Sequence, residues 1–181
     1  TKLMTAMVVL DAQLPLTETL TIGDEDVRTL KGTHSRLKVG TQLSREDMLL
    51  LALMASENRA ASALSHHYPG GAAAFIEAMN HKAAAIGLKD TRFSDPTGLT
   101  AANVSSARDL TKMVSAASHY PLIRELSTTS ERTMLVGGPQ GHLRVLAETE
   151  LEDSTSVIVG TGSHVEFDGA TTVWGGEFQV F

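Results

Sequence analysis

Apolar positions in the first two thirds of the chain recur at helical spacing. Leu3, Met7 and Leu10 follow one another at intervals of four and three, which places them on one face of a helix over residues 2–13. Residues 48–55 are apolar on nearly all sides, a pattern typical of a helix at the centre of a core. Further helical patterns cover residues 59–67, 72–86, 106–118 and 121–126.

Ser44 and Ser106 mark the starts of two of these helices. Each is followed three residues later by an aspartate, Asp47 or Asp109, and then by a helical pattern. A serine hydroxyl in this position accepts a hydrogen bond from a free backbone N–H of the first turn. Both serines are therefore predicted to be N-caps.

The composition changes after about residue 130, where Val, Thr and Gly become frequent and Ala becomes rare. Short β-type runs separated by turns predict strands at residues 133–136, 143–146, 156–159, 165–167, 171–174 and 178–181. Two earlier strands are predicted at 20–22 and 36–39. Helices first and strands last indicate an α+β fold, with a helical cluster (1–130) packed on an antiparallel sheet (131–181) in one domain.

Charge and composition exclude several functional classes. The 181 residues carry a net charge of −6 and no basic run longer than two, so neither a nucleic acid nor an anionic membrane surface is an expected partner. Cysteine is absent, which excludes disulfides and thiolate catalysis. No stretch of about 18 apolar residues exists to form a transmembrane segment.

The seven histidines do not form a recognisable metal motif. His66 and His67 are adjacent, so on a helix their side chains diverge and cannot both face one ion. None of the histidines occurs in a His-Glu-x-x-His arrangement, and no phosphate loop or dinucleotide fingerprint is present. We expect neither a metal nor a cofactor.

Lys2 is the first candidate catalytic residue. It opens an apolar helix, and a lysine desolvated in such a place loses its proton more easily and can serve as a general base. A serine three residues before a lysine shares its helix face, and Ser-x-x-Lys is a signature of serine acyl-transfer enzymes. That serine position lies two residues upstream of Thr1. The alternative is that Lys2 is a frayed residue before an amphipathic helix.

Ser56 and Asn58 form a second candidate motif, Ser-x-Asn, directly after the buried helix. The hydroxyl can relay a proton, and the amide can hold both the lysine and a substrate amide. The alternative is that Ser56 caps the helix at 59–67.

Together the two motifs and their surroundings resemble the low-molecular-mass penicillin-binding proteins, which are D-alanyl-D-alanine carboxypeptidases and endopeptidases of peptidoglycan. Ser-Glu-Asn in place of Ser-Gly-Asn is most like the D,D-endopeptidase branch. The resemblance covers about residues 1–130 and weakens over 131–181. The stretches that carry it are residues 2–6, 54–61, 68–71, 91–99 and 107–111.

The family also has a Lys-Thr-Gly strand that binds the substrate. The matching segment here is Gly160-Thr161-Gly162, with glycine in place of lysine. His142, Arg144 or His164 is a candidate for the missing positive charge. An ordinary hairpin turn is the alternative interpretation of this segment.

The resemblance implies a penicillin-binding-protein or serine β-lactamase-like transpeptidase fold, truncated here at both ends. It further implies a serine D,D-peptidase acting on D-Ala-containing peptides of peptidoglycan through an acyl-enzyme, with Lys2, Ser56 and Asn58 as catalytic residues. β-Lactams would be covalent inhibitors, and the location would be the periplasm or cell envelope. The chain itself, which lacks the nucleophile, is expected to be inactive.

Two other interpretations remain open. Gly160 favours a homologue whose site has decayed and that only binds cell-wall peptide or a protein partner. A serine β-lactamase would need a deacylating glutamate on a loop after Ser-x-Asn. Glu77 and Glu125 are the only glutamates in the next seventy residues, and neither lies in a matching loop.

Overall fold

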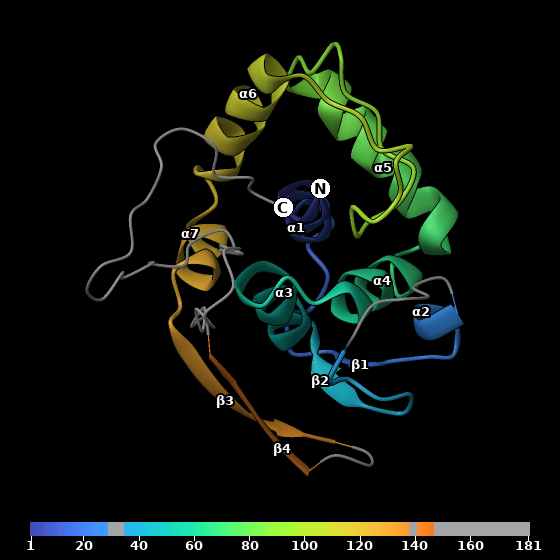
Figure 1. Ribbon diagram of the computed structural model, residues 1–181, viewed down its shortest axis with the longest axis vertical. Coiled ribbons are helices and arrows are strands. Elements are labelled where there is room, and N and C mark those ends of the chain that lie inside the picture. The colour runs from blue at the N-terminus through green and yellow to red at the C-terminus, as the bar shows by residue number, and fades with distance from the viewer. Residues whose placement is uncertain (29–34, 138–140, 147–181) are drawn as a thin grey trace, which may run out of the picture.

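A central helix, α1 (Lys2–Asp11), organises the computed structural model, which describes residues 1–28, 35–137 and 141–146. Figure 1 views α1 almost along its axis, with the other long helices arranged around it. Those that contact it are α3 (Arg45–Met54), α4 (Asn58–His66), α5 (Gly71–Ala85), α6 (Ala107–Ala117) and α7 (Pro121–Ser127). The six predicted helices are therefore confirmed, with their bounds shifted by a few residues.

The central position of α1 follows from its apolar surface. Residues 4–9 are all buried, and Met4 and Met7 are fully excluded from solvent. Residues 48–54 of α3 are buried in the same way, as their all-round apolar pattern predicts. Each such side chain contributes about 1.5–3 kcal/mol when it is removed from water, so these two helices hold the core together.

The described strands form two antiparallel pairs. Strand β1 (Thr19–Thr21) pairs with β2 (Gln42–Ser44), and β3 (Glu131–Val136) pairs with β4 (Gly141–Leu146). Gln42 and Gly137 exchange backbone hydrogen bonds of 3.0 Å in both directions, which joins the two pairs. The α+β fold is confirmed.

The predicted strand at residues 36–39 is wrong. The partner of β1 is β2, and the chain between them turns at Gly40, which has a φ of 84°. The Gly40 N–H donates to Ile22 O, and the Thr41 N–H donates to Lys38 O.

The short helix α2 (Glu25–Arg28) was not predicted, because four mostly polar residues carry no helical period. The predicted strands at 156–159, 165–167, 171–174 and 178–181 lie outside the described residues.

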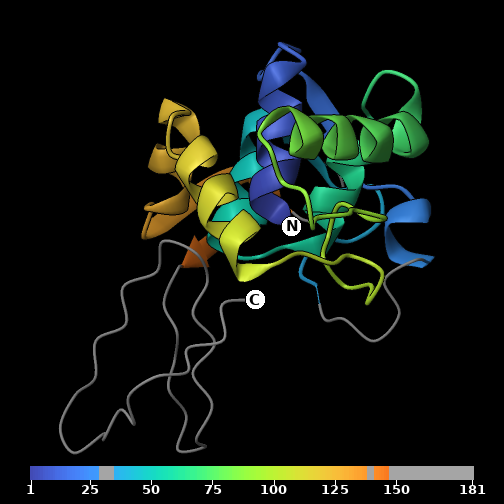
Figure 2. The ribbon, with the colours of Figure 1, turned by 90° about the horizontal axis from the view of Figure 1, so that it is seen from above.

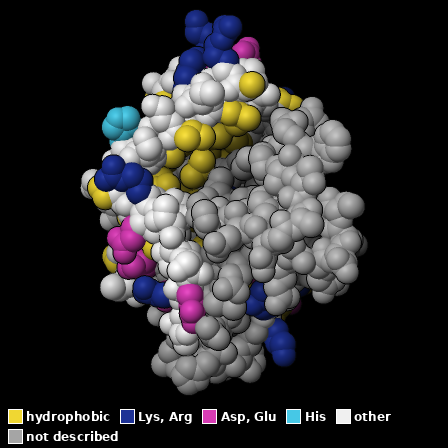
Figure 3. Space-filling model, turned by 60° about the vertical axis from the view of Figure 1, so that its left-hand side comes forward, with side chains coloured by type: hydrophobic (Ala, Val, Ile, Leu, Met, Phe, Trp, Pro, Cys, Tyr) yellow, Lys and Arg dark blue, Asp and Glu magenta, His cyan; other side chains and the backbone are white. Residues whose placement is uncertain are grey.

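Helix α6 presents apolar surface on two sides. Met113 and Ala117 point into the core, whereas Leu110 and Val114 are 44% and 54% exposed. Figure 3 shows hydrophobic side chains gathered on the face where α6 and α7 lie. Among the described residues, no helix is long and apolar enough to cross a membrane.

Both predicted helix caps are present, and they allow a direct test. Ser44 Oγ accepts from Asp47 N at 3.0 Å, and Ser106 Oγ accepts from Asp109 N at 3.3 Å.

Ser44→Ala should lower the free energy of unfolding by about 1 kcal/mol, because it leaves a first-turn N–H of α3 without its acceptor. Urea unfolding measures this. Ser115→Ala on exposed α6 surface is the control, with an expected change below about 0.5 kcal/mol.

Candidate active site

Lys2 joins three segments that are distant in the sequence. Its Nζ donates to Asn58 Oδ1 at 2.7 Å and to the main-chain oxygen of Thr97 at 2.9 Å. Lys2 lies in the first turn of α1, Asn58 begins α4, and Thr97 belongs to the loop between α5 and α6. Figure 2 shows the N-terminal end of α1 beside this loop. The structure thus brings two of the three candidate catalytic residues into direct contact.

The environment of Lys2 favours a neutral amine. Burial lowers the pKa of Lys2 to about 8, and the carboxylates of Asp95 and Glu57 oppose part of this shift. A neutral amine has two N–H groups and one lone pair. In the neutral form Asn58 and Thr97 would accept both N–H groups, which would leave the lone pair free to accept a proton. This is the arrangement that a general base requires.

Ser56 occupies a sharp turn between α3 and α4. Its φ is 50°, in the left-handed region that residues with a side chain rarely adopt. The N–H groups of Ala55 and Glu57 both donate to Leu51 O, which folds the chain back at the end of α3. Strained residues of this kind cluster at functional sites.

The alternative prediction that Ser56 caps the next helix is wrong. The N-cap of α4 is Glu57, whose carboxylate accepts from Arg59 N at 3.0 Å. The hydroxyl of Ser56 is therefore not used as the cap of α4. Ser56 lies two residues before Asn58, on the turn that carries Asn58 to Lys2.

The loop that contains Thr97 packs closely against α1. Pro96 O accepts from the hydroxyl of Thr5, a fully buried residue, at 2.7 Å. Gly98 has a φ of 92°, and a Cβ placed there would lie 3.0 Å from Thr1 Oγ1. Only glycine combines this backbone conformation with so close an approach. The sequence resemblance singles out this loop but assigns no role to the Thr97 carbonyl.

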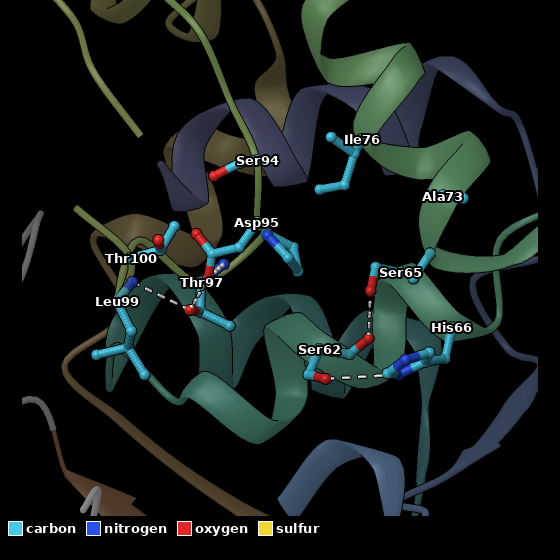
Figure 4. Close-up of a pocket in the computed structure, with 12 residues that line it drawn as sticks. Ser62, Ser65, His66, Ala73, Ile76, Ser94, Asp95, Thr97, Leu99 and Thr100 are labelled. Atoms are coloured by element: carbon cyan, nitrogen blue, oxygen red, sulfur yellow. Dashed lines mark hydrogen bonds between the residues drawn. The ribbon is translucent and has the colours of Figure 1, made fainter. Parts of the chain in front are cut away.

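A cavity of about 400 Å³ lies between α4, α5 and the same loop. Figure 4 shows His66, Ile76, Asp95 and Thr97 among the side chains that line it. The loop therefore contacts α1 through some of its atoms and borders this cavity with others.

One cluster near the cavity has the composition of a metal site. Ligand atoms of Glu25, Asp26 and His66 lie within 4.8 Å of one another. The buried Asp26 already interacts with protein groups, since it accepts from Gly23 N at 2.8 Å and Ser62 Oγ at 2.7 Å and lies 2.7 Å from His66 Nδ1. The cluster is thus accounted for as a network joining α2 to α4. Sequence spacing missed it because forty residues separate Asp26 from His66.

The candidate substrate-binding segment, Gly160, Thr161 and Gly162, lies outside the described residues. The same holds for His164 and for the side chains of His142 and Arg144. Their proposed roles stay predictions from the sequence.

Comparison with known proteins identifies the family. The family model described as D-alanyl-D-alanine carboxypeptidase matches residues 1–160. The chain belongs to the D-alanyl-D-alanine carboxypeptidase family of peptidases. A solved structure of this family, the D-alanyl-D-alanine carboxypeptidase from Mycobacterium tuberculosis, superposes with a TM-score of 0.71 at 26% identity. The superposition covers 82% of this chain and 55% of that one, which supports the penicillin-binding-protein fold.

Two family members named D-alanyl-D-alanine endopeptidase are similar in sequence. The protein from Escherichia coli is 57% identical over 138 residues, which is 76% of this chain and 44% of that protein. The protein from Pseudomonas aeruginosa is 56% identical over 139 residues, which is 77% of this chain and 45% of that protein. The chain spans less than half the length of these relatives.

The strained turn at Ser56 predicts different effects of two substitutions. Ser56→Gly should raise the free energy of unfolding by up to about 1 kcal/mol, because glycine adopts this backbone without strain. Ser56→Ala keeps the strain and should not stabilise the protein. Thermal unfolding of both variants distinguishes them, and equal midpoints would contradict the inferred strain.

Proposed function

We propose that this chain forms part of a serine D,D-peptidase that cleaves D-Ala-containing peptide bonds of peptidoglycan through an acyl-enzyme. The observation that carries the proposal is the geometry of Lys2, a half-buried amine held by two acceptors, Asn58 Oδ1 and Thr97 O. Family membership supports the same reaction class. The nucleophile would be a serine two residues before Thr1, one helical turn from Lys2.

In the proposed mechanism Lys2 Nζ takes the serine proton while the serine oxygen attacks the carbonyl of a D-Ala residue. The tetrahedral intermediate then breaks the peptide bond, and the leaving amine takes a proton that Lys2 or Ser56 delivers. Asn58 keeps Lys2 oriented and its amide nitrogen is available to the substrate. Water hydrolyses the acyl-enzyme, with no metal or cofactor. Gly160, Thr161 and Gly162 would position the peptide.

We favour endopeptidase action on peptide cross-links over carboxypeptidase action. Ser-Glu-Asn at 56–58 and the two endopeptidase-named relatives support this choice. Since the substrate is part of the cell wall, the expected location is the periplasmic side of the cell envelope. A purified cross-linked muropeptide dimer and a D-Ala-D-Ala pentapeptide, offered in equal amounts to the full-length protein, would separate the two activities. Preferential release of terminal D-Ala would contradict the endopeptidase assignment.

The full-length protein should form a covalent adduct with penicillin, visible as an increase in intact mass equal to one antibiotic molecule. Lys2→Met should reduce the acylation rate by roughly two to four orders of magnitude, since it removes the general base. Lys38→Met, at an exposed residue between β1 and β2, is the matched control and should react like wild type. No adduct with the wild-type protein would favour the second candidate function, a binding-only homologue, which the glycine at position 160 supports.

The rate of acylation should depend on the protonation of Lys2. Burial lowers the pKa of this residue to about 8, so the reactive neutral form increases as the pH rises through that value. We expect the acylation rate constant to rise tenfold per pH unit below about 8 and to level off above it. Stopped-flow measurement between pH 6 and 10 gives the profile. A plateau already reached at pH 6 would contradict the assignment of Lys2 as the base.

A further inference from the structure

The loop that supplies the second acceptor for Lys2 is organised around one carboxylate, that of Asp95. Asp95 Oδ1 accepts from Gly98 N at 3.0 Å, and Oδ2 accepts from Thr97 N at 3.3 Å and from the Thr97 hydroxyl. An aspartate that accepts from the backbone N–H two and three residues ahead closes a tight turn. The backbone of residues 95–98 is thus folded around the side chain of Asp95.

Asn103 fixes Asp95 from the other side. Its Nδ2 donates to Asp95 Oδ1 at 2.6 Å and to Asp95 O at 3.0 Å, while its Oδ1 accepts from Asp95 N at 3.1 Å. Asp95 is therefore held through its carboxylate, its carbonyl and its N–H. A residue bound through all three groups has little freedom to move, and the turn that it closes is equally constrained.

The consequence of this turn appears at α1. Two successive carbonyl groups, of Pro96 and Thr97, accept from Thr5 Oγ1 and Lys2 Nζ on the same helix. The hydrogen bonds of the Asp95 carboxylate go to the loop, whereas the carbonyl of Thr97 reaches the amine. Asp95 thus affects Lys2 through the position of the Thr97 carbonyl and through its negative charge.

We propose that Asp95 is a positioning residue for the reaction: it closes the turn of residues 95–98 and so keeps the Thr97 carbonyl on Lys2 Nζ. This inference rests on the proposed function. Without the turn, Thr97 O moves off the amine, the second N–H of Lys2 loses its acceptor, and the lone pair is no longer held toward the serine. Asp95 touches neither the substrate nor the reacting atoms in this scheme.

The geometric effect and the charge effect are separable. Asp95→Glu retains the charge but adds a methylene group, so it displaces the turn. Asp95→Asn removes the charge and replaces one acceptor oxygen by a donor that faces Thr97 or Asn103. Because the Asp95 carboxylate opposes the lowering of the pKa of Lys2 by burial, its removal lowers that pKa further.

The test measures penicillin acylation of the full-length protein over pH 6–10. Asp95→Glu should slow acylation on the order of 10- to 100-fold, as expected for misplacement of a reacting group, with the midpoint of the pH profile unchanged. Asp95→Asn should slow it similarly and move the midpoint to lower pH. Asp90→Asn is the matched control, since this exposed carboxylate accepts from Ser106 and has no contact with the turn. It should retain the wild-type rate and midpoint.

Wild-type rate and wild-type midpoint in both Asp95 variants would overturn the proposal. A slower acylation by Asp95→Glu would also overturn it if urea unfolding showed an equal loss of folded protein. The residue would then act on stability alone. If wild-type protein forms no adduct, the proposed function fails, and the positioning role is read directly instead. NMR of labelled lysine should then show a displaced Lys2 signal in Asp95→Glu, which keeps the charge, and an unchanged Lys2 signal in that variant would sink the inference.

Discussion

A single amino group, Nζ of Lys2, joins the core helix α1, the start of α4, and the loop before α6. An amine placed against an apolar helix loses hydration, and this loss favours its neutral form. The two acceptors offset part of the cost because they replace water as hydrogen-bond partners. The positions of Asn58 and of the loop therefore both depend on where α1 packs in the core.

This constraint accounts for the irregular backbone near Lys2. Ser56 adopts a left-handed conformation in the turn that leads to Asn58 at the start of α4. Gly98 also has a left-handed conformation, and it lies close to Thr1. A left-handed non-glycine residue costs on the order of 1–3 kcal/mol. Burial of the apolar side chains of α1 and α3 stabilises the fold by more than this strain costs, so the strain is tolerated. The helices thereby hold the candidate catalytic groups, which lie on the first turns of α1 and α4 and on the connecting segments.

Much of the fold was predictable because its helices carry strong apolar periods and clear caps such as Ser44 and Ser106. The contact between Lys2 and Asn58 could be anticipated from side-chain types, whereas the role of Ser56 stays a prediction. The Thr97 carbonyl could not be anticipated, since a main-chain acceptor leaves no mark on residue type and depends on the turn that Asp95 closes. The strand predicted at 36–39 failed because Gly40 turns the chain there.

The cavity beside the loop has a mechanical consequence. Most side chains in the core are supported on all sides by others, which makes their surroundings stiff. The loop that contains Thr97 packs against α1 on one side. On its other side it borders a cavity of about 400 Å³. Its rigidity therefore comes from its own hydrogen bonds rather than from close packing. Warming should therefore loosen the support of the amine before it loosens the core, so the contact between Lys2 and Thr97 should be lost while the protein is still folded.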